Sequence, residues 1–139
     1  AGPAPAEKLP VRPAAHPCRR DTNDPRKDKE KHGQNPPGWD KAKSCEDLIK
    51  GIIDGGAGTP ITADGKCAAG SNKASVQFGA KVTRKDDPRD FHFARERPDG
   101  SWCEKRGSYP ELNSPQEPNP LPGYKHCGYV CIKNGYNTD

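Results

Sequence analysis

The sequence predicts an α+β fold: one helix packed on a small, mainly antiparallel sheet, stapled by disulfides and surrounded by long irregular loops. Three observations predict it: one stretch with helical apolar spacing, several short stretches of alternating apolar and polar residues, and six cysteines in a chain poor in large apolar side chains. About 16 of the 139 residues, roughly 12%, are Leu, Ile, Val or Phe, whereas chains below ~20% are usually disordered. Because so little apolar surface does not offset the entropy of ordering the chain, we expect disulfides to supply the remaining stability.

The cysteines indicate an oxidising compartment. An even number of them on such a chain is typical of secreted proteins, so all six are predicted to form disulfides: Cys18, Cys45, Cys67, Cys103, Cys127 and Cys131. The chain contains no Met and opens with Ala, Gly and Pro only, which favours an end left by signal-peptide removal, although an internal fragment would look the same. No apolar run approaches the ~18 residues of a membrane span. The expected location is therefore outside the cell.

Residues 1–43 are predicted to form an N-terminal arm, and residues 44–139 a single small α+β domain. The arm is rich in Pro, Gly and charged residues and shows neither helical nor strand periodicity. Cys18 is expected to tie the arm to the domain, and Trp39 is its candidate apolar anchor.

The helix is predicted to begin at Ser44. Ser44 and Asp47 have the spacing of a capping box, in which Asp47 returns a hydrogen bond to the Ser44 amide. The apolar residues that follow share one helical face: Cys45, Leu48, Ile49, Ile52 and Ile53. The pair Gly55-Gly56 is expected to end the helix, because glycine adopts the left-handed conformation without strain.

The first strand is predicted after a loop at residues 57–73, which contains Cys67 and a turn at Asp64-Gly65. Apolar residues then alternate with polar residues and glycine, which is the period of a strand with one buried face. The apolar members are Val76, Phe78, Ala80 and Val82.

A hairpin is predicted next. Its strands are residues 91–95 and Trp102-Cys103, and the Pro-Asp-Gly sequence at residues 98–100 supplies the turn. Residues 107–123 contain five prolines. Since proline has no amide donor, this stretch is predicted to be a long surface loop.

The last strand is predicted over residues 124–132. If this strand is regular, Cys127, Tyr129 and Cys131 lie on one face. Cys127 and Cys131 would then be too far apart to bond to each other, because their Cα atoms would be ~13 Å apart and a disulfide spans at most ~6.8 Å. Each cysteine is therefore expected to bond elsewhere.

Charge and spacing argue against several classes of function. Lys and Arg number 23 against 19 Asp and Glu, a net charge of +4. The two signs alternate over residues 26–31, whereas a nucleic-acid surface needs a stripe of one sign, so a polyanion partner is the less favoured alternative. No metal site is predicted, because no C-x-x-C or H-x-x-x-H spacing is present, and no cofactor is predicted, because no phosphate-binding glycine loop follows a strand.

Cys45 and His92 are candidates for catalysis. Cys45 lies in the first turn of the predicted helix, where the helix dipole favours a thiolate. His92 lies between two phenylalanines on a strand, so its side chain is expected to point away from their rings, to solvent or into a groove. With Asp90 orienting the imidazole, these residues would form a small papain-like or cell-wall-peptidase-like Cys-His hydrolase. Glu46 and Asp47 oppose ionisation of Cys45, and the alternative is that Cys45 lies in a disulfide and His92 on the surface.

The C-terminal part of the chain carries an ordered series of short motifs. They are Asp90-Phe91-His92-Phe93, Asp99-Gly100-Ser101-Trp102, Lys105 with Gly107, Tyr124, and Cys127-Gly128-Tyr129-Val130-Cys131. Over about 45 residues this order resembles a poorly characterised group of mostly extracellular and microbial proteins, some labelled insoluble matrix shell proteins. That group has Ser-His where this chain has Cys103-Glu104, and Asn-Cys-aromatic where it has Ser44-Cys45-Glu46. The resemblance implies that the hairpin and the terminal cysteine pair form one unit, and it leaves activity open.

The leading functional prediction is a secreted, non-enzymatic binding protein, such as an effector, a toxin-like module or a matrix component. Its partner would be a protein or a glycan outside the cell. The predicted interface is the hairpin with the Pro-rich loop, because exposed aromatic and Arg side chains anchor interfaces: Phe93, Arg95, Arg97, Trp102 and Tyr109. The alternative is that Phe93 and Trp102 belong to the core.

Overall fold

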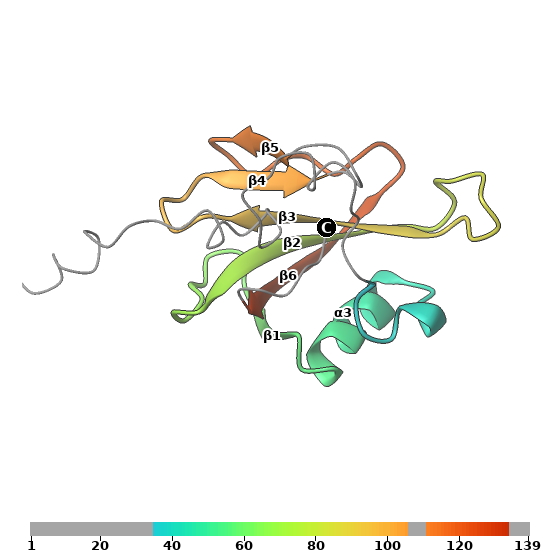
Figure 1. The fold of residues 1–139 in the computed structure, drawn as a ribbon, viewed down its shortest axis with the longest axis horizontal. Coiled ribbons are helices and arrows are strands. Elements are labelled where there is room, and N and C mark those ends of the chain that lie inside the picture. Colours follow the sequence, from blue (N-terminus) through green and yellow to red (C-terminus); the bar gives the residue numbers. More distant parts are fainter. Residues whose placement is uncertain (1–34, 106–110, 134–139) are drawn as a thin grey trace, which may run out of the picture.

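The computed structural model describes residues 35–105 and 111–133, and these form one antiparallel sheet with one α-helix, α3 (Cys45–Asp54), beside it (Figure 1). The strand order is β1-β6-β2-β3-β4-β5, and each neighbouring pair is antiparallel. The strands are β1 (Gly58–Ile61), β2 (Ser71–Gly79), β3 (Asp90–Glu96), β4 (Trp102–Lys105), β5 (Glu111–Ser114) and β6 (Lys125–Lys133). The predicted α+β class, with one helix and a mainly antiparallel sheet, is present.

Helix α3 begins and ends close to where the sequence predicts. The Ser44 hydroxyl accepts a hydrogen bond from the Asp47 amide at 3.2 Å. The Asp47 carboxylate accepts from the amide of Lys43 at 2.9 Å, one residue before the predicted partner. At the other end Gly56, with φ +76°, takes the left-handed conformation, whereas Gly55 does not. The local sequence therefore sets both ends of the helix.

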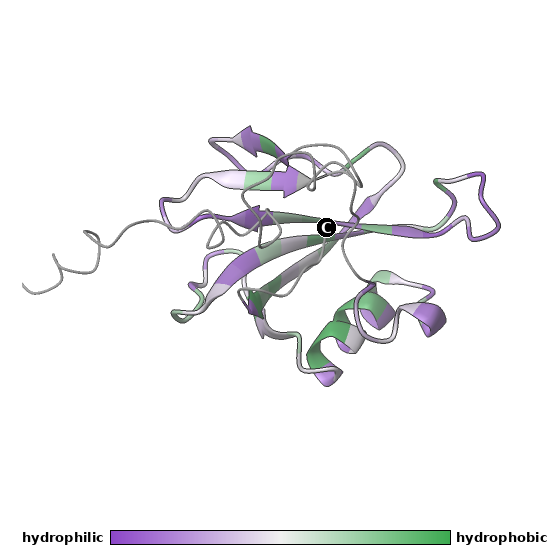
Figure 2. Ribbon diagram, in the orientation of Figure 1, coloured by the Kyte–Doolittle hydropathy of each residue, from purple (hydrophilic) through white to green (hydrophobic). Residues whose placement is uncertain are grey.

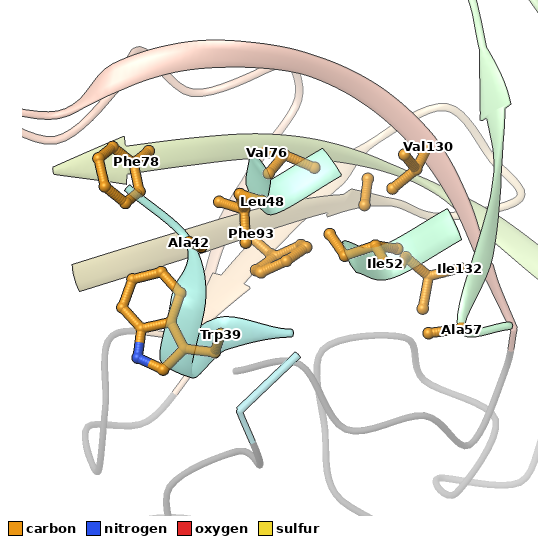
Figure 3. Close-up of a cluster of buried hydrophobic side chains, with 11 residues drawn as sticks. Trp39, Ala42, Leu48, Ile52, Ala57, Val76, Phe78, Phe93, Val130 and Ile132 are labelled. Carbon is orange, nitrogen blue, oxygen red and sulfur yellow. The ribbon is translucent and has the colours of Figure 1, made fainter. Parts of the chain in front are cut away.

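The apolar core lies between α3 and one face of the sheet (Figure 3). Leu48 and Ile52 are fully buried there, while Cys45 and Ile49 are partly buried at its margin. The sheet contributes alternate residues of three adjacent strands: Ala74, Val76 and Phe78 of β2, Phe93 of β3, and Val130 and Ile132 of β6. We call this side of the sheet the helix face and the other side the polar face.

Residues 35–43, which the sequence assigned to the arm, contribute to this core. Trp39 lies in a 3-10 helix (Trp39–Lys41) and packs edge-on against Phe91, with ring centroids 4.9 Å apart. The Arg89 guanidinium lies 4.2 Å from the centre of the Trp39 ring and donates to the carbonyl oxygens of Trp39 and Ala42. The proposed role of Trp39 as an apolar anchor agrees with its burial. The arm residues 1–34, with Cys18, lie outside the described residues.

Three predicted loop and strand boundaries are wrong. Residues 58–61 and 111–114, predicted as loop, are the edge strands β1 and β5. Strand β2 starts five residues earlier than predicted and ends at Gly79, and it is buried on both faces. Ala80 is therefore exposed, and the following loop is mostly hydrophilic (Figure 2). Strands buried on both faces do not alternate apolar and polar residues. The search for such alternation therefore did not detect the first half of β2.

A β-bulge in β6 changes the predicted orientation of its cysteines. Val76 pairs with Gly128, whereas the next residue, Gln77, pairs with His126, so Cys127 has no residue opposite it. Gly128 has φ +138°, a conformation that favours glycine. The extra residue turns Cys127 towards α3, whereas Cys131 remains on the polar face.

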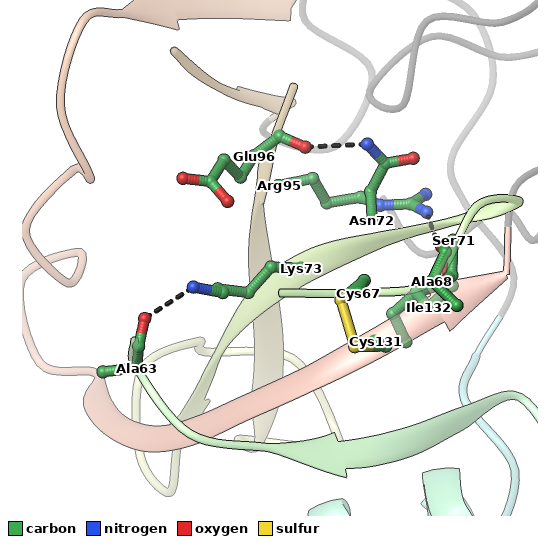
Figure 4. The surroundings of a disulfide bond; sticks show 10 residues. All are labelled: Ala63, Cys67, Ala68, Ser71, Asn72, Lys73, Arg95, Glu96, Cys131 and Ile132. Carbon is green, nitrogen blue, oxygen red and sulfur yellow. Dashed lines mark hydrogen bonds between the residues drawn. A yellow bond between two sulfur atoms is a disulfide. The ribbon is translucent and has the colours of Figure 1, made fainter. Parts of the chain in front are cut away.

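Two disulfides join β6 to other parts of the chain. Cys127 bonds Cys45 at the start of α3, and Cys131 bonds Cys67 in the β1–β2 loop (Figure 4). Cys103 is disulfide-bonded as well, and no cysteine of the described residues is free. Among these residues no helix is long and apolar enough to cross a membrane.

Reduction of the disulfides is expected to unfold the protein near room temperature. The two bonds close loops with sequence separations of 82 and 64 residues, and constraint of the unfolded chain by loops of this size is worth about 4 kcal/mol each. Circular dichroism melts with and without reductant measure the effect, and alkylation before reduction should label none of the five described cysteines. A cooperative melt that reduction barely moves would contradict the prediction.

Candidate functional site

The residues predicted for catalysis lie in three separate places. The Cys45 sulfur is bonded to Cys127 on the helix face, so it cannot form a thiolate while the disulfide is intact. Asp90 accepts a hydrogen bond from the hydroxyl of Tyr124. His92 pairs across the strands with Gln77 and projects from the polar face. The sheet therefore separates the proposed nucleophile from the proposed base.

His92 is buried, contrary to the prediction that it faces solvent or a groove. Its side chain does point away from the rings of Phe91 and Phe93, as predicted, but only 5% of the residue is exposed. Its Nε2 atom lies 2.6 Å from Oε1 of Glu104 on β4. A short, buried imidazole–carboxylate contact of this kind orients both groups and ties β3 to β4.

Most of the predicted interface is also buried. Phe93 belongs to the core on the helix face, and Arg95 and Trp102 are 3% and 6% exposed. Arg97 is half-buried and donates to the side chains of Asn113 and Ser101 and to the carbonyl oxygen of Trp102. These side chains are therefore engaged in packing and hydrogen bonds within the protein. Tyr109 lies outside the described residues.

A groove runs along the flank of α3. We call it the helix groove; its volume is about 530 Å³, and it is lined by Cys45, Glu46, Ile49, Lys50, Ile53, Asp54 and Cys127. The predicted apolar stripe of the helix is wider than the part that the sheet covers. Leu48 and Ile52 point into the core, whereas Ile49 and Ile53 are only half-buried and line the groove. The Cys45–Cys127 disulfide forms part of its wall.

The charges of the helix groove are at its rim. Lys50 and Asp54 form an exposed i, i+4 ion pair, and this contact raises the pKa of the Lys50 ammonium. Glu46 is exposed and makes no ion pair within the described part of the chain. The groove therefore combines an apolar floor with one carboxylate available at its edge.

A polar cleft of about 500 Å³ lies at one end of the sheet, between the loop that holds Cys67 and the β3–β4 turn (Figure 4). Two of its three basic side chains are already engaged, because Lys73 donates to the carbonyl oxygen of Ala63 and Arg97 is bonded within the hairpin. The third, Lys66, is exposed. Glu96 and Asp99 also line it. Its mixed charge selects no particular class of ligand.

The polar face carries a third cluster, which the sequence analysis missed. Residues 115–123 cross this face, and we call them the strap. Glu117 of the strap accepts hydrogen bonds from the Ser75 hydroxyl at 3.0 Å and the Tyr129 hydroxyl at 2.7 Å. His126 packs edge-on against the Tyr129 ring, with centroids 4.9 Å apart, and its Nε2 lies 3.6 Å from Oε2 of Glu117. The cluster depends on the bulge, which places residues three apart on one face, so no strand period could have revealed it.

The comparisons give no relative: no family model, no curated protein and no solved structure matches this chain. The resemblance of the C-terminal motifs to matrix shell proteins stays a prediction. The described residues also contain no group of three or more His, Cys, Asp or Glu side chains arranged to hold a metal ion. The functional argument therefore rests on the surfaces described above.

Replacing His92 with Ala is expected to lower the free energy of unfolding by about 1.5–3 kcal/mol, because it removes a buried hydrogen-bonded contact with the Glu104 carboxylate. Chemical denaturation of the oxidised protein measures it. Lys50→Ala, which removes one partner of the exposed ion pair with Asp54, is the control and should change stability little. Equal effects of the two substitutions would show that burial does not strengthen the His92–Glu104 contact.

Two tyrosines are expected to ionise late in an alkaline titration. Burial, followed by the hydrogen bond to Glu117, raises the pKa of Tyr129 from 10.0 to about 12. Burial and the hydrogen bond to Asp90 raise the pKa of Tyr124 as well. Since the fold favours the neutral phenol of Tyr129, its contribution to stability is complete below pH 10 and is lost as the pH rises through about 12.

Ultraviolet absorbance of the phenolates measures this titration. Tyr129→Phe should remove one late step and leave the other. Ionisation of all four tyrosines of the chain together near pH 10, the ordinary value, would show that these hydroxyls are not held as described.

Proposed function

We propose that this chain is a secreted, disulfide-stabilised, non-enzymatic binding protein, and that the helix groove is the surface that binds its partner. The observation that carries the proposal is the half-buried apolar lining of the groove at Ile49 and Ile53. Concave apolar surfaces with few polar groups are typical of binding sites. The disulfides support the extracellular location, because such bonds persist in oxidising compartments.

The lining of the groove favours a protein partner over a glycan. Hydroxyl groups of a sugar lose their water on binding and need polar partners, and the floor of the groove offers none from Ile49, Ile53 or the Cys45–Cys127 bond. An aliphatic or aromatic side chain of a partner would instead bury its apolar surface there. The Glu46 carboxylate at the rim favours a basic residue beside that side chain.

No observation favours the alternative of a Cys-His hydrolase. Its nucleophile is in a disulfide, and its base is paired with Glu104 on the other side of the sheet. Effector, toxin-like module and matrix component all remain compatible with binding through a groove.

Peptide selection on the immobilised, oxidised protein tests the proposal. A random peptide library should yield peptides with a large apolar side chain next to Lys or Arg. Their affinity should fall at least tenfold on Ile53→Glu, since tenfold equals about 1.4 kcal/mol and burial of one such side chain contributes more than that.

The matched control is Ile61→Glu, which places the same substitution at a half-buried isoleucine of β1, outside the groove. It should leave the affinity within about twofold, and thermal melts should show that both variants fold. Selected peptides that bind the Ile53→Glu variant as tightly as the unchanged protein would refute the groove as the binding surface.

A further inference from the structure

The loop between β2 and β3, residues 80–89, extends beyond the neighbouring strands at one end of the sheet (Figure 1). We call it the β2–β3 loop. Hydrogen bonds close it on itself: the amide of Val82 donates to the carbonyl oxygen of Pro88 at 2.9 Å, and the Thr83 hydroxyl donates to the carbonyl oxygen of Asp87 at 2.8 Å. The loop therefore has a fixed shape, although most of its residues are exposed.

Two side chains attach the β2–β3 loop to the rest of the protein. Val82 lies so close to Gly79 and Gly123 that a Cβ atom at these glycines would come within 2.6 Å and 3.1 Å of it. Arg89, whose contacts with the 3-10 helix are described above, also donates to the Asp87 carboxylate from Nε at 3.0 Å and from Nη2 at 2.8 Å. The charges of Arg89 and Asp87 therefore neutralise each other.

The remaining charged side chains of the loop have no partner in the described part of the chain. They are exposed and make no ion pair or side-chain hydrogen bond there: Lys81, Arg84, Lys85 and Asp86. Three of them are basic and one is acidic, so the loop presents positive charge in excess. Basic residues this close together in the sequence are typical of anion-binding segments.

We propose that the β2–β3 loop is a second binding surface and that its partner is an anionic polysaccharide outside the cell. Sulfate and carboxylate groups of such a polymer accept hydrogen bonds from lysine ammonium groups. They also match the planar guanidinium of Arg84, which can donate to two oxygens at once. Because hydrogen bonds already hold the loop backbone, binding requires little further ordering of the chain.

Two observations favour a polysaccharide over other polyanions. The exposed residues of the loop include no aromatic side chain, on which the bases of a single-stranded nucleic acid would stack, and no large apolar side chain that could enter a lipid bilayer. The disulfides are compatible with an extracellular location. The inference does not rest on the proposed protein partner, since no residue of the loop lines the helix groove.

Calorimetric titration of the full oxidised chain with heparin, which carries both sulfate and carboxylate groups, tests the inference. Binding should weaken as the salt concentration rises, because salt screens exposed charges. Arg84→Gln/Lys85→Gln should bind about five- to twentyfold more weakly, since each exposed ion pair changes an equilibrium up to about fivefold. Asp86→Asn removes the one unpaired carboxylate of the loop and should bind about two- to fivefold more tightly.

The matched control is Lys66→Gln/Lys133→Gln, which removes two exposed lysines near the start of β2 and so gives the same net charge. Strand β2, about 26 Å long at ~3.3 Å per residue, separates them from the loop. This control should keep the heparin affinity within about twofold, and thermal melts should show that every variant folds.

Equal weakening by the two double variants would show that heparin responds only to the overall charge, and it would overturn the proposal. An Asp86→Asn variant that binds no more tightly than the unchanged protein would also overturn it. Duplex DNA and vesicles of anionic lipid serve as competing polyanions, and tighter binding to either of them than to heparin at the same salt concentration would refute the polysaccharide as the partner.

Discussion

The β-bulge at Cys127 and Gly128 is the constraint on which the rest of the structure depends. One extra residue in β6 reverses the inward and outward order of the side chains on its two sides. Cys127 can therefore reach Cys45 on α3, while His126 and Tyr129 both face the strap. Without this shift the helix disulfide and the Glu117 cluster could not both form, because their β6 residues would lie on the wrong faces.

Strand β6 also explains how a chain with so few large apolar residues holds one fold. This strand lies between β1 and β2. It also carries one cysteine of the Cys45–Cys127 disulfide and one of the Cys67–Cys131 disulfide. The helix face is apolar and covered by α3, whereas the polar face is held by side-chain hydrogen bonds and by the His92–Glu104 contact. Disulfides reduce the entropy of the unfolded chain, and a small core then suffices.

The small number of large apolar residues also determines which surfaces are available for function. Phe93 and Trp102, chosen as interface anchors from their residue type, are needed inside the protein. The apolar surface that α3 leaves uncovered is at Ile49 and Ile53, where the helical stripe is wider than its contact with the sheet. The helix groove and the strap lie on opposite faces, so a partner could occupy one without touching the other.

The sequence by itself determined the features that depend on neighbouring residues. The Ser44 cap, the apolar face of α3 and the turn before β4 follow from local hydrogen bonding and spacing, and each is present. The existence of two of the central strands could be predicted in the same way. Only the tertiary structure decided the edge strands β1 and β5, the cysteine pairing and the burial of His92. These features depend on which distant segment lies opposite, since a strand gains its hydrogen bonds, and a sulfur its partner, from residues far away along the chain.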